Sequence, residues 1–259
     1  MKRIDLIGCP GVGKSTLYEL LCSKNNDILS LESAKEKIAK NKIKENSYSF
    51  KEIYKRFLLF SKLYKITIIN LPDIILNKKK REELFFQHKY IKQFLEFYLN
   101  NVNNSKMNEV SKLSSIASFN DCLKNTILVE NSKYEDCVLM DESLSHKSIL
   151  NLIYPNKAET IKYLSLMHKP SALIVCAASP KKIFNRIKKR EKETGDILQT
   201  YNEIDSAKLL ERIQYYLDYY NFIADFMQEM VPVLRLDLDE PTKKNIKKTN
   251  DFIKSLLSS

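Results

Sequence analysis

The sequence of 259 residues predicts an α/β fold in which helices cover both faces of a five-stranded parallel sheet. Short apolar, β-branched runs alternate along the chain with amphipathic helical patterns, as strands and helices do in such folds. A glycine-rich loop also stands between the first of these runs and the helical pattern that follows, where α/β folds bind phosphate groups. The predicted strands are residues 3–7, 28–31, 137–140, 172–176 and 233–236.

The first predicted strand leads into the segment GCPGVGKST, which matches the phosphate-binding pattern G-x-x-x-x-G-K-[ST] (Walker A) at every fixed position. The chain has only four glycines, and three of them fall in this loop. Tight turns and amide groups that converge on an anion require glycine, so the loop predicts a P-loop NTPase three-layer fold that binds ATP. The expected nucleotide-binding residues are Gly8, Cys9, Pro10, Gly11, Val12, Gly13, Lys14, Ser15 and Thr16.

Two side chains of the loop have expected roles. Lys14 would reach the β- and γ-phosphates, and the Ser15 hydroxyl would ligate Mg²⁺. The backbone N–H groups at the start of the following helix would face the phosphates.

The second and third predicted strands are separated by residues 33–136, which we interpret as a long helical insertion. Amphipathic helix patterns occur at residues 50–64, 82–99 and 108–123, and residues 66–69 fit either an extra strand or a buried helix end. We expect the insertion to bind the phosphoryl acceptor. The alternative is that these helices only cover the core.

The third predicted strand ends in acid, with Asp141 and Glu142 directly after it. A carboxylate at the carboxyl end of a strand beside a phosphate loop is well placed to hold Mg²⁺, and we assign this role to Asp141 together with Ser15. Glu142 could orient or deprotonate an acceptor hydroxyl. The alternative is that both acids stabilise the N-terminus of a following helix.

The fourth predicted strand is followed by a turn and a basic helix that carries Arg186 and Arg190 on one face. We interpret residues 181–200 as a lid, with Gly195 as a point where it bends. Two arginines on such a lid would neutralise the charge of the phosphoryl group in transfer. An ordinary charged helix in solvent would show the same pattern.

Composition narrows the class of protein. The net charge is +11, but basic residues are mixed with acidic ones, which favours small anionic ligands over nucleic acid as partners. The five cysteines lack C-x-x-C spacing, no apolar run approaches a membrane span, and no signal-peptide core is present, so we expect a cytoplasmic location. The three histidines lack metal-ligand spacing, and we interpret His146 as a surface or capping residue rather than part of an acceptor pocket. A homodimer is compatible with the sequence.

The chain resembles the nucleoside and nucleotide kinase group of P-loop kinases, of the thymidylate kinase and deoxynucleoside kinase type. The segments GCPGVGKST, VLMDES, LIVCAASPKKIFNRIKKRE and VPVLRLD carry the resemblance. It implies a single kinase-like domain over residues 1–259, MgATP as donor, and in-line phosphoryl transfer. Deoxynucleoside kinases have acid-Arg-Ser where this chain has Asp141, Glu142 and Ser143, and the Asp-Arg pair of thymidylate kinases is also absent. Glu32 matches by position alone a catalytic carboxylate of deoxynucleoside kinases.

These observations predict an ATP- and Mg²⁺-dependent kinase that phosphorylates a hydroxyl or phosphate of a nucleoside, nucleotide, sugar or polyol. Its expected catalytic residues are Lys14, Asp141, Glu142, Arg186 and Arg190. Glu142 and Glu32 both stay open as the base. The alternatives are a nucleotide-dependent regulatory ATPase or switch, and a polynucleotide kinase.

Overall fold

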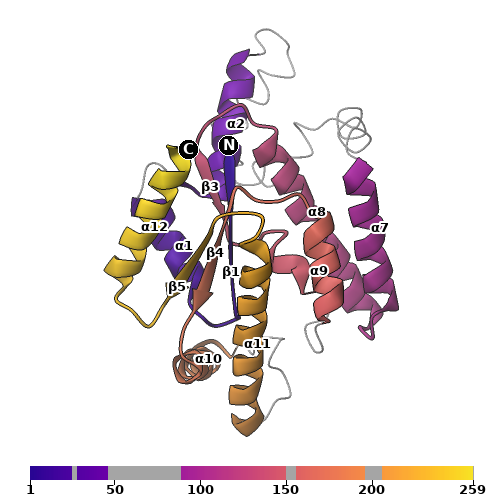
Figure 1. Ribbon diagram of the computed structural model, residues 1–259, viewed down its shortest axis with the longest axis vertical. Coiled ribbons are helices and arrows are strands. Elements are labelled where there is room, and N and C mark those ends of the chain that lie inside the picture. The colour runs from indigo at the N-terminus through magenta and orange to yellow at the C-terminus, as the bar shows by residue number, and fades with distance from the viewer. Residues whose placement is uncertain (25–27, 46–88, 150–155, 196–205, 259) are drawn as a thin grey trace.

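A computed structural model describes residues 1–24, 28–45, 89–149, 156–195 and 206–258 (Figure 1). The strands are β1 (Lys2–Gly8), β2 (Ile28–Leu29), β3 (Cys137–Met140), β4 (Ala172–Ala177) and β5 (Val233–Asp237). The helices are α1 (Lys14–Lys24), α2 (Leu31–Glu45), α7 (Lys89–Asn104), α8 (Glu109–Glu130), α9 (Lys157–Leu166), α10 (Pro180–Thr194), α11 (Ser206–Met227) and α12 (Thr242–Leu257), with a 3₁₀ turn, η1, at His146–Ser148.

The strands form one sheet in the order β2-β3-β1-β4-β5, and every neighbouring pair is parallel. The predicted five-stranded parallel sheet is therefore confirmed. β1 lies in the centre, with β3 on one side and β4 on the other. The later strands lie on both sides of β1, with β2 and β3 in one half of the sheet and β4 and β5 in the other. In open parallel sheets, ligands bind outside the carboxyl ends of the strands at the point where the strand order reverses in this way.

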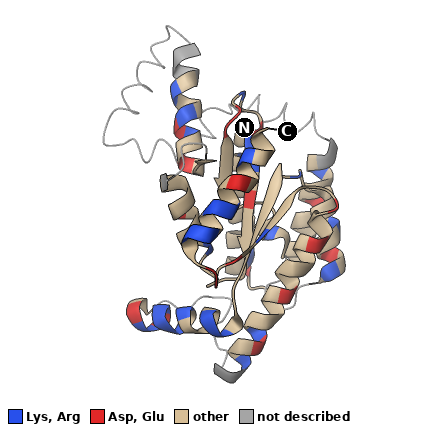
Figure 2. Cartoon of the chain, turned by 60° about the vertical axis from the view of Figure 1, so that its left-hand side comes forward, with Lys and Arg blue, Asp and Glu red and all other residues tan. Residues whose placement is uncertain are grey.

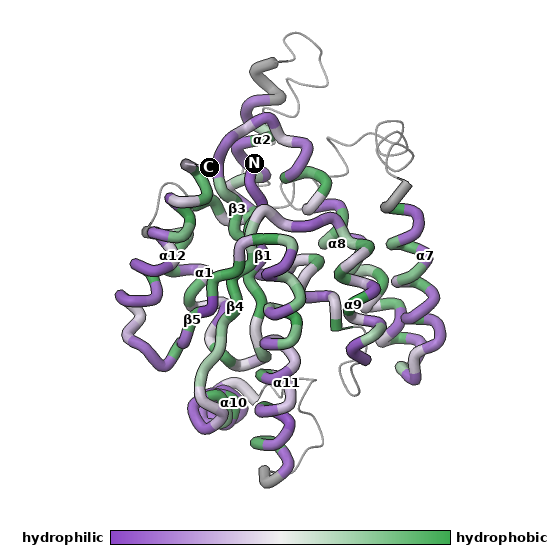
Figure 3. Tube along the Cα trace, viewed as in Figure 1, coloured by the Kyte–Doolittle hydropathy of each residue, from purple (hydrophilic) through white to green (hydrophobic). Residues whose placement is uncertain are grey.

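Helices cover both faces of the sheet, with α1 and α12 on one face and α8, α9 and α11 on the other (Figure 1). Two covered faces explain why the strands β3 and β4, on either side of β1, are continuously apolar. Ile4, Leu6 and Leu139 are fully buried, and Figure 3 shows the central strands as hydrophobic segments. Among the described helices, none is long and apolar enough to cross a membrane.

The second strand is shorter than predicted. Residues 28–31 were expected to be extended, but β2 ends at Leu29 and α2 begins at Leu31. Ser30 explains the early helix start, because its hydroxyl oxygen accepts a hydrogen bond from the Ser33 N–H at 3.1 Å and thereby caps the helix. As a result Glu32 lies in the first turn of α2 and not at a strand tip.

Helices α2, α7 and α8 are the described part of the predicted insertion at residues 33–136. Asn108 caps α8 by accepting a hydrogen bond from the Ser111 N–H at 2.8 Å. The helix continues past the predicted end at residue 123 to Glu130, because the apolar residues that follow are buried against the core. The expected features at residues 50–64 and 66–69, and the first part of the pattern at 82–99, lie outside the described residues, and the acceptor-binding role stays a prediction.

Candidate active site

The phosphate loop connects β1 to α1 through two glycines in left-handed conformation. The φ angles of Gly11 and Gly13 are 82° and 102°, a region that residues with a side chain rarely adopt. The Leu17 N–H then donates to the Gly13 carbonyl at 3.2 Å, which begins the hydrogen bonding of α1. The N-terminus of α1 therefore opens directly from the loop, as in sites that bind phosphate through backbone amides.

Helix α10 packs against this loop so closely that glycine is needed for a second reason. A Cβ atom on Gly11 would lie 2.8 Å from Ile187 Cγ1, and one on Gly13 would lie 3.3 Å from Arg186 Nη1. The Arg186 guanidinium also donates a hydrogen bond to the Val12 carbonyl. The arginine-bearing helix and the phosphate loop thus form a single packed unit.

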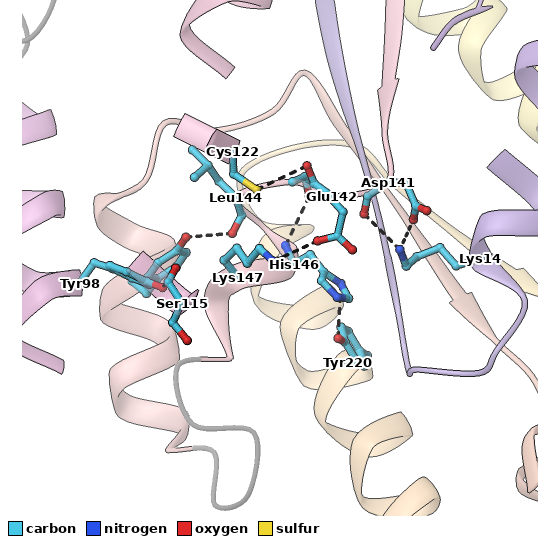
Figure 4. Close-up of polar contacts among 12 residues, drawn as sticks. Lys14, Tyr98, Ser115, Cys122, Asp141, Glu142, Leu144, His146, Lys147 and Tyr220 are labelled. Carbon is cyan, nitrogen blue, oxygen red and sulfur yellow. Dashed lines mark hydrogen bonds and ion pairs between the residues drawn. The ribbon is translucent and has the colours of Figure 1, made fainter. Parts of the chain in front are cut away.

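Lys14, Ser15 and Asp141 meet at the carboxyl ends of β1 and β3 (Figure 4 shows the first and last). The Lys14 ammonium forms an ion pair with the Asp141 carboxylate and also donates to the Asp141 carbonyl at 3.1 Å. The Ser15 hydroxyl donates to the other carboxylate oxygen at 3.0 Å. Parallel pairing of β1 with β3 brings these residues together, although 127 positions separate Lys14 from Asp141.

Glu142 points away from this trio, toward Lys147 and the ring of His146 (Figure 4). Its exposed carboxylate lies 3.0 Å from the Lys147 ammonium. Burial of its surroundings opposes ionisation, but His146, Lys147 and Lys14 together hold the pKa of Glu142 below its ordinary value. The Glu142 side chain is therefore ionised at neutral pH and able to accept a proton.

A cleft of about 630 Å³ extends over the phosphate loop. The loop and α1 provide its floor through residues 8–17 and Leu20, while Glu142 and His146 line the side that follows β3. Arg186, Ile187 and Arg190 of α10 form another wall. The wall after β5 consists of Leu238, Glu240, Thr242 and Asn245. The volume of the whole cleft lies within the range of small-molecule sites.

Asp239 anchors the start of α10 to the segment after β5. Its carboxylate accepts a hydrogen bond from the Ser179 N–H at 3.1 Å and lies 3.4 Å from the Lys182 ammonium. At the other end, Gly195 caps the helix in left-handed conformation, with φ of 71°. Figure 2 shows the concentration of Lys and Arg along α10. Residues 196–200 of the predicted lid lie outside the described part, and movement of this helix stays a prediction.

Two parts of the cleft lining, His146 and the wall after β5, were not predicted from the sequence. His146 lies in its wall, whereas sequence reasoning interpreted it as a surface or capping residue. Its position five residues beyond the acidic strand tip was the available signal. The wall after β5 carried no motif. Glu32 is absent from the described lining residues, and its carboxylate lies 3.4 Å from the Tyr18 hydroxyl.

The site combines cationic groups that can bind a polyanion with the Asp141 carboxylate beside them. Backbone amides, Lys14, Arg186 and Arg190 surround the floor with positive charge, which suits a phosphate chain. Ser15 and Asp141 supply two hard oxygen atoms at one point, the donor type that Mg²⁺ prefers alongside phosphate and water. Among the described residues, no group of three or more His, Cys, Asp and Glu side chains is arranged to hold a metal ion by itself.

No protein-family model matches the sequence, and no curated protein sequence matches it. The structure is similar to that of deoxyadenosine kinase from M. mycoides with the products dCMP and dCDP, with a TM-score of 0.50 and 13% identity, covering 98% of this chain and 99% of that one. The same enzyme with dATP gives 0.45 and 12%, over 97% and 99%, and with dCTP it gives 0.44 and 16%, over 98% and 99%.

The α/β fold of this chain, with its five-stranded parallel sheet, is therefore similar to the fold of that deoxyadenosine kinase over nearly its full length. The resemblance stated from sequence motifs agrees with this fold. At 13% identity the likeness is one of fold, and the activity has to be inferred from the site itself.

Proposed function

We propose that this protein is an ATP- and Mg²⁺-dependent small-molecule kinase that transfers the γ-phosphoryl group of ATP to a hydroxyl or phosphate acceptor. The contact of Asp141 with Lys14 and Ser15, which line one cleft together with Arg186 and Arg190, carries the proposal. A loop that only bound an anion would need neither the carboxylate nor the arginine-bearing wall.

The donor half of the cleft would bind the triphosphate. Amides of the loop and of the first turn of α1 would donate to the β-phosphate, and Lys14 would contact the β- and γ-phosphates. Ser15 and Asp141 would hold Mg²⁺, which would supply positive charge to neutralise the phosphates. Arg186 and Arg190, on the facing helix, would stabilise the charge on the phosphoryl group in transfer.

The transfer itself needs little covalent chemistry from the protein. The acceptor oxygen forms a bond to the γ-phosphorus, the bond to the β,γ-bridging oxygen breaks, and ADP leaves with that electron pair. A carboxylate takes the proton of an acceptor hydroxyl. We assign this role to Glu142, because it is ionised and lines the cleft, whereas Glu32 lies outside the described lining.

Among acceptor classes, we place nucleosides and nucleotides first and sugars and polyols next. The support is the fold shared with deoxyadenosine kinase, whose structure contains dCMP and dCDP. The predicted insertion would hold the acceptor opposite the donor cleft.

The test is ATP consumption with Mg²⁺ against a panel of deoxynucleosides, nucleosides, nucleoside monophosphates, sugars and polyols. Lys14→Ala should abolish turnover. Lys254→Ala is the matched control, because Lys254 is exposed near the end of α12 and is not among the residues that line the cleft. Stimulation by one class in the wild type and in Lys254→Ala, but not in Lys14→Ala, would support the kinase and identify its acceptor class.

Two further results would redirect the assignment. Hydrolysis that no small molecule stimulates, but a protein partner does, would favour a regulatory ATPase. Activity on polynucleotide ends that falls steeply with added salt would favour a polynucleotide kinase.

Comparison of Glu142→Gln with Glu32→Gln identifies the base. The variant that removes the base should lose about 100-fold or more in turnover.

A further inference from the structure

The turn that carries His146 is held by buried hydrogen bonds from two different elements. Asp5 of β1 accepts from the Ser145 hydroxyl at 2.5 Å and from its N–H at 3.3 Å. From α9, the Tyr163 hydroxyl donates to the Leu144 carbonyl at 3.0 Å, and Thr160 donates to the Ser148 carbonyl at 3.0 Å. A surface or capping histidine would not need this support, whereas a side chain that must meet a substrate at a defined point would.

The His146 ring lies between the Glu142 carboxylate and Tyr220 of α11 (Figure 4). Its Nδ1 atom is 3.5 Å from the Tyr220 hydroxyl, and the two rings stack with centroids 6.0 Å apart. Tyr220 is buried, and burial raises the pKa of its hydroxyl well above the ordinary value, so the hydroxyl keeps its proton and can donate it to Nδ1. A neutral imidazole that accepts at Nδ1 carries its own proton on Nε2.

Burial, aided by two neighbouring lysines, keeps this imidazole neutral. Burial lowers the pKa of His146 to about 4, and Lys14 and Lys147 act in the same direction, while Glu142 and Asp141 oppose them. His146 therefore presents one N–H donor to a cleft that already contains the Lys14 and Arg186 cations. A neutral imidazole donor next to a reacting oxygen can stabilise developing negative charge without a change in its own protonation.

We propose that His146, held as the Nε2–H tautomer by Tyr220, donates a hydrogen bond to the γ-phosphoryl group during transfer and is thus a further catalytic residue of this site. The inference rests on the proposed kinase function. It predicts that His146 responds to a nucleotide with a γ-phosphate and not to ADP.

The chain has three histidines, which makes imidazole ¹⁵N NMR a direct test. Spectra of the full chain would be recorded free, with Mg-ADP, and with the non-hydrolysable ATP analogue Mg-AMP-PNP. Variants with glutamine at each histidine assign the signals. We expect His146 to be a neutral Nε2–H imidazole at pH 7 and its signals to shift with Mg-AMP-PNP beyond any shift with Mg-ADP. His168 is the internal control, because its exposed ring pairs with Glu130 at 2.9 Å.

Steady-state kinetics with the acceptor that the panel assay identifies provide a second readout. His146→Ala should lower kcat about 10- to 100-fold, the loss expected for one hydrogen bond to a charged group, with the Kd for ADP unchanged. Tyr220→Phe should lower kcat several-fold by releasing the tautomer while His146 itself remains. Tyr215→Phe is the matched control, since Tyr215 lies on the same helix with its side chain exposed.

The outcomes separate the two proposals. If Mg-AMP-PNP binds, and the His146 signals move no more than with Mg-ADP or show an Nδ1–H tautomer, the role of His146 is overturned and the kinase proposal stands. If His146→Ala transfers phosphate at the wild-type rate, the same holds. If neither nucleotide binds, the kinase proposal fails and the role of His146 fails with it.

Discussion

Replacing Gly13 by alanine should separate the binding function of the phosphate loop from the stability of the fold. Gly13 has a φ of 102°, and the added Cβ would lie 3.3 Å from Arg186 Nη1. Gly195, at the end of α10, is the matched control. Its φ is 71°, but nothing lies within 4 Å of an added Cβ, so alanine there meets only the backbone penalty.

The structure gives the expected magnitudes. A left-handed conformation costs a residue with a Cβ about 1–2 kcal/mol, so both variants should lose about that much free energy of unfolding. Only at Gly13 must the loop or the Arg186 guanidinium also shift. Misplacing one amide that faces a phosphate removes a hydrogen bond to a charged group worth about 1.5–3 kcal/mol, which corresponds to about a 10- to 100-fold weaker nucleotide affinity.

The assay combines urea unfolding with fluorescence titration of a labelled ATP analogue in Mg²⁺. We expect Gly195→Ala to bind the nucleotide like the wild type, and Gly13→Ala to bind it about 10- to 100-fold more weakly at similar stability. Equal affinity in both variants would refute the assignment of this loop as the phosphate site. Loss of affinity in both would show that α10, and not the loop geometry, controls binding.

Three other changes test separate parts of the account. Arg186→Ala should lower turnover about 100-fold while changing the Kd for ATP only a few-fold, measured by steady-state kinetics and titration beside the exposed control Lys189→Ala; unchanged turnover would remove Arg186 from the catalytic role. Asp5→Asn should destabilise the fold by about 3 kcal/mol in urea, because the buried Arg3 guanidinium, 3.3 Å from Asp5 and 3.2 Å from Glu130, would lose the more deeply buried of these two carboxylate partners; a loss below about 1 kcal/mol would contradict the reasoning. The unfolded chain binds a proton at His146 near the ordinary pKa of 6.5 and the folded chain only near about 4, so stability should fall as pH decreases between these values, by on the order of 3 kcal/mol, and His146→Gln should abolish this component of the pH–stability curve.

The parts of the fold that the sequence predicted well are those set by local chemistry. Gly11 and Gly13 stand where only glycine tolerates the backbone, so the loop could be located from its composition. The buried strands β3 and β4 were visible as apolar runs because helices cover both faces of the sheet. The end of β2 was misplaced by two residues, since the Ser30 cap that starts α2 early was overlooked.

What the sequence could not predict depends on packing between distant segments. The strand order decides that Asp141 lies beside Lys14, and no local pattern contains that order. The contact of α10 with the phosphate loop, through Ile187 and Arg186, likewise follows from tertiary packing. His146 carried no motif, and its place in the cleft depends on a turn anchored by β1 and α9.

Calorimetric titration of the full chain with ATP, with and without Mg²⁺, tests the central claim most directly. The account predicts one-to-one binding that requires Mg²⁺ for full affinity and is weakened about tenfold or more in Lys14→Ala, because that variant loses a charged contact to the phosphates. Absence of binding at millimolar ATP, or equal affinity in Lys14→Ala, would contradict the assignment of this cleft as the site of a phosphoryl donor.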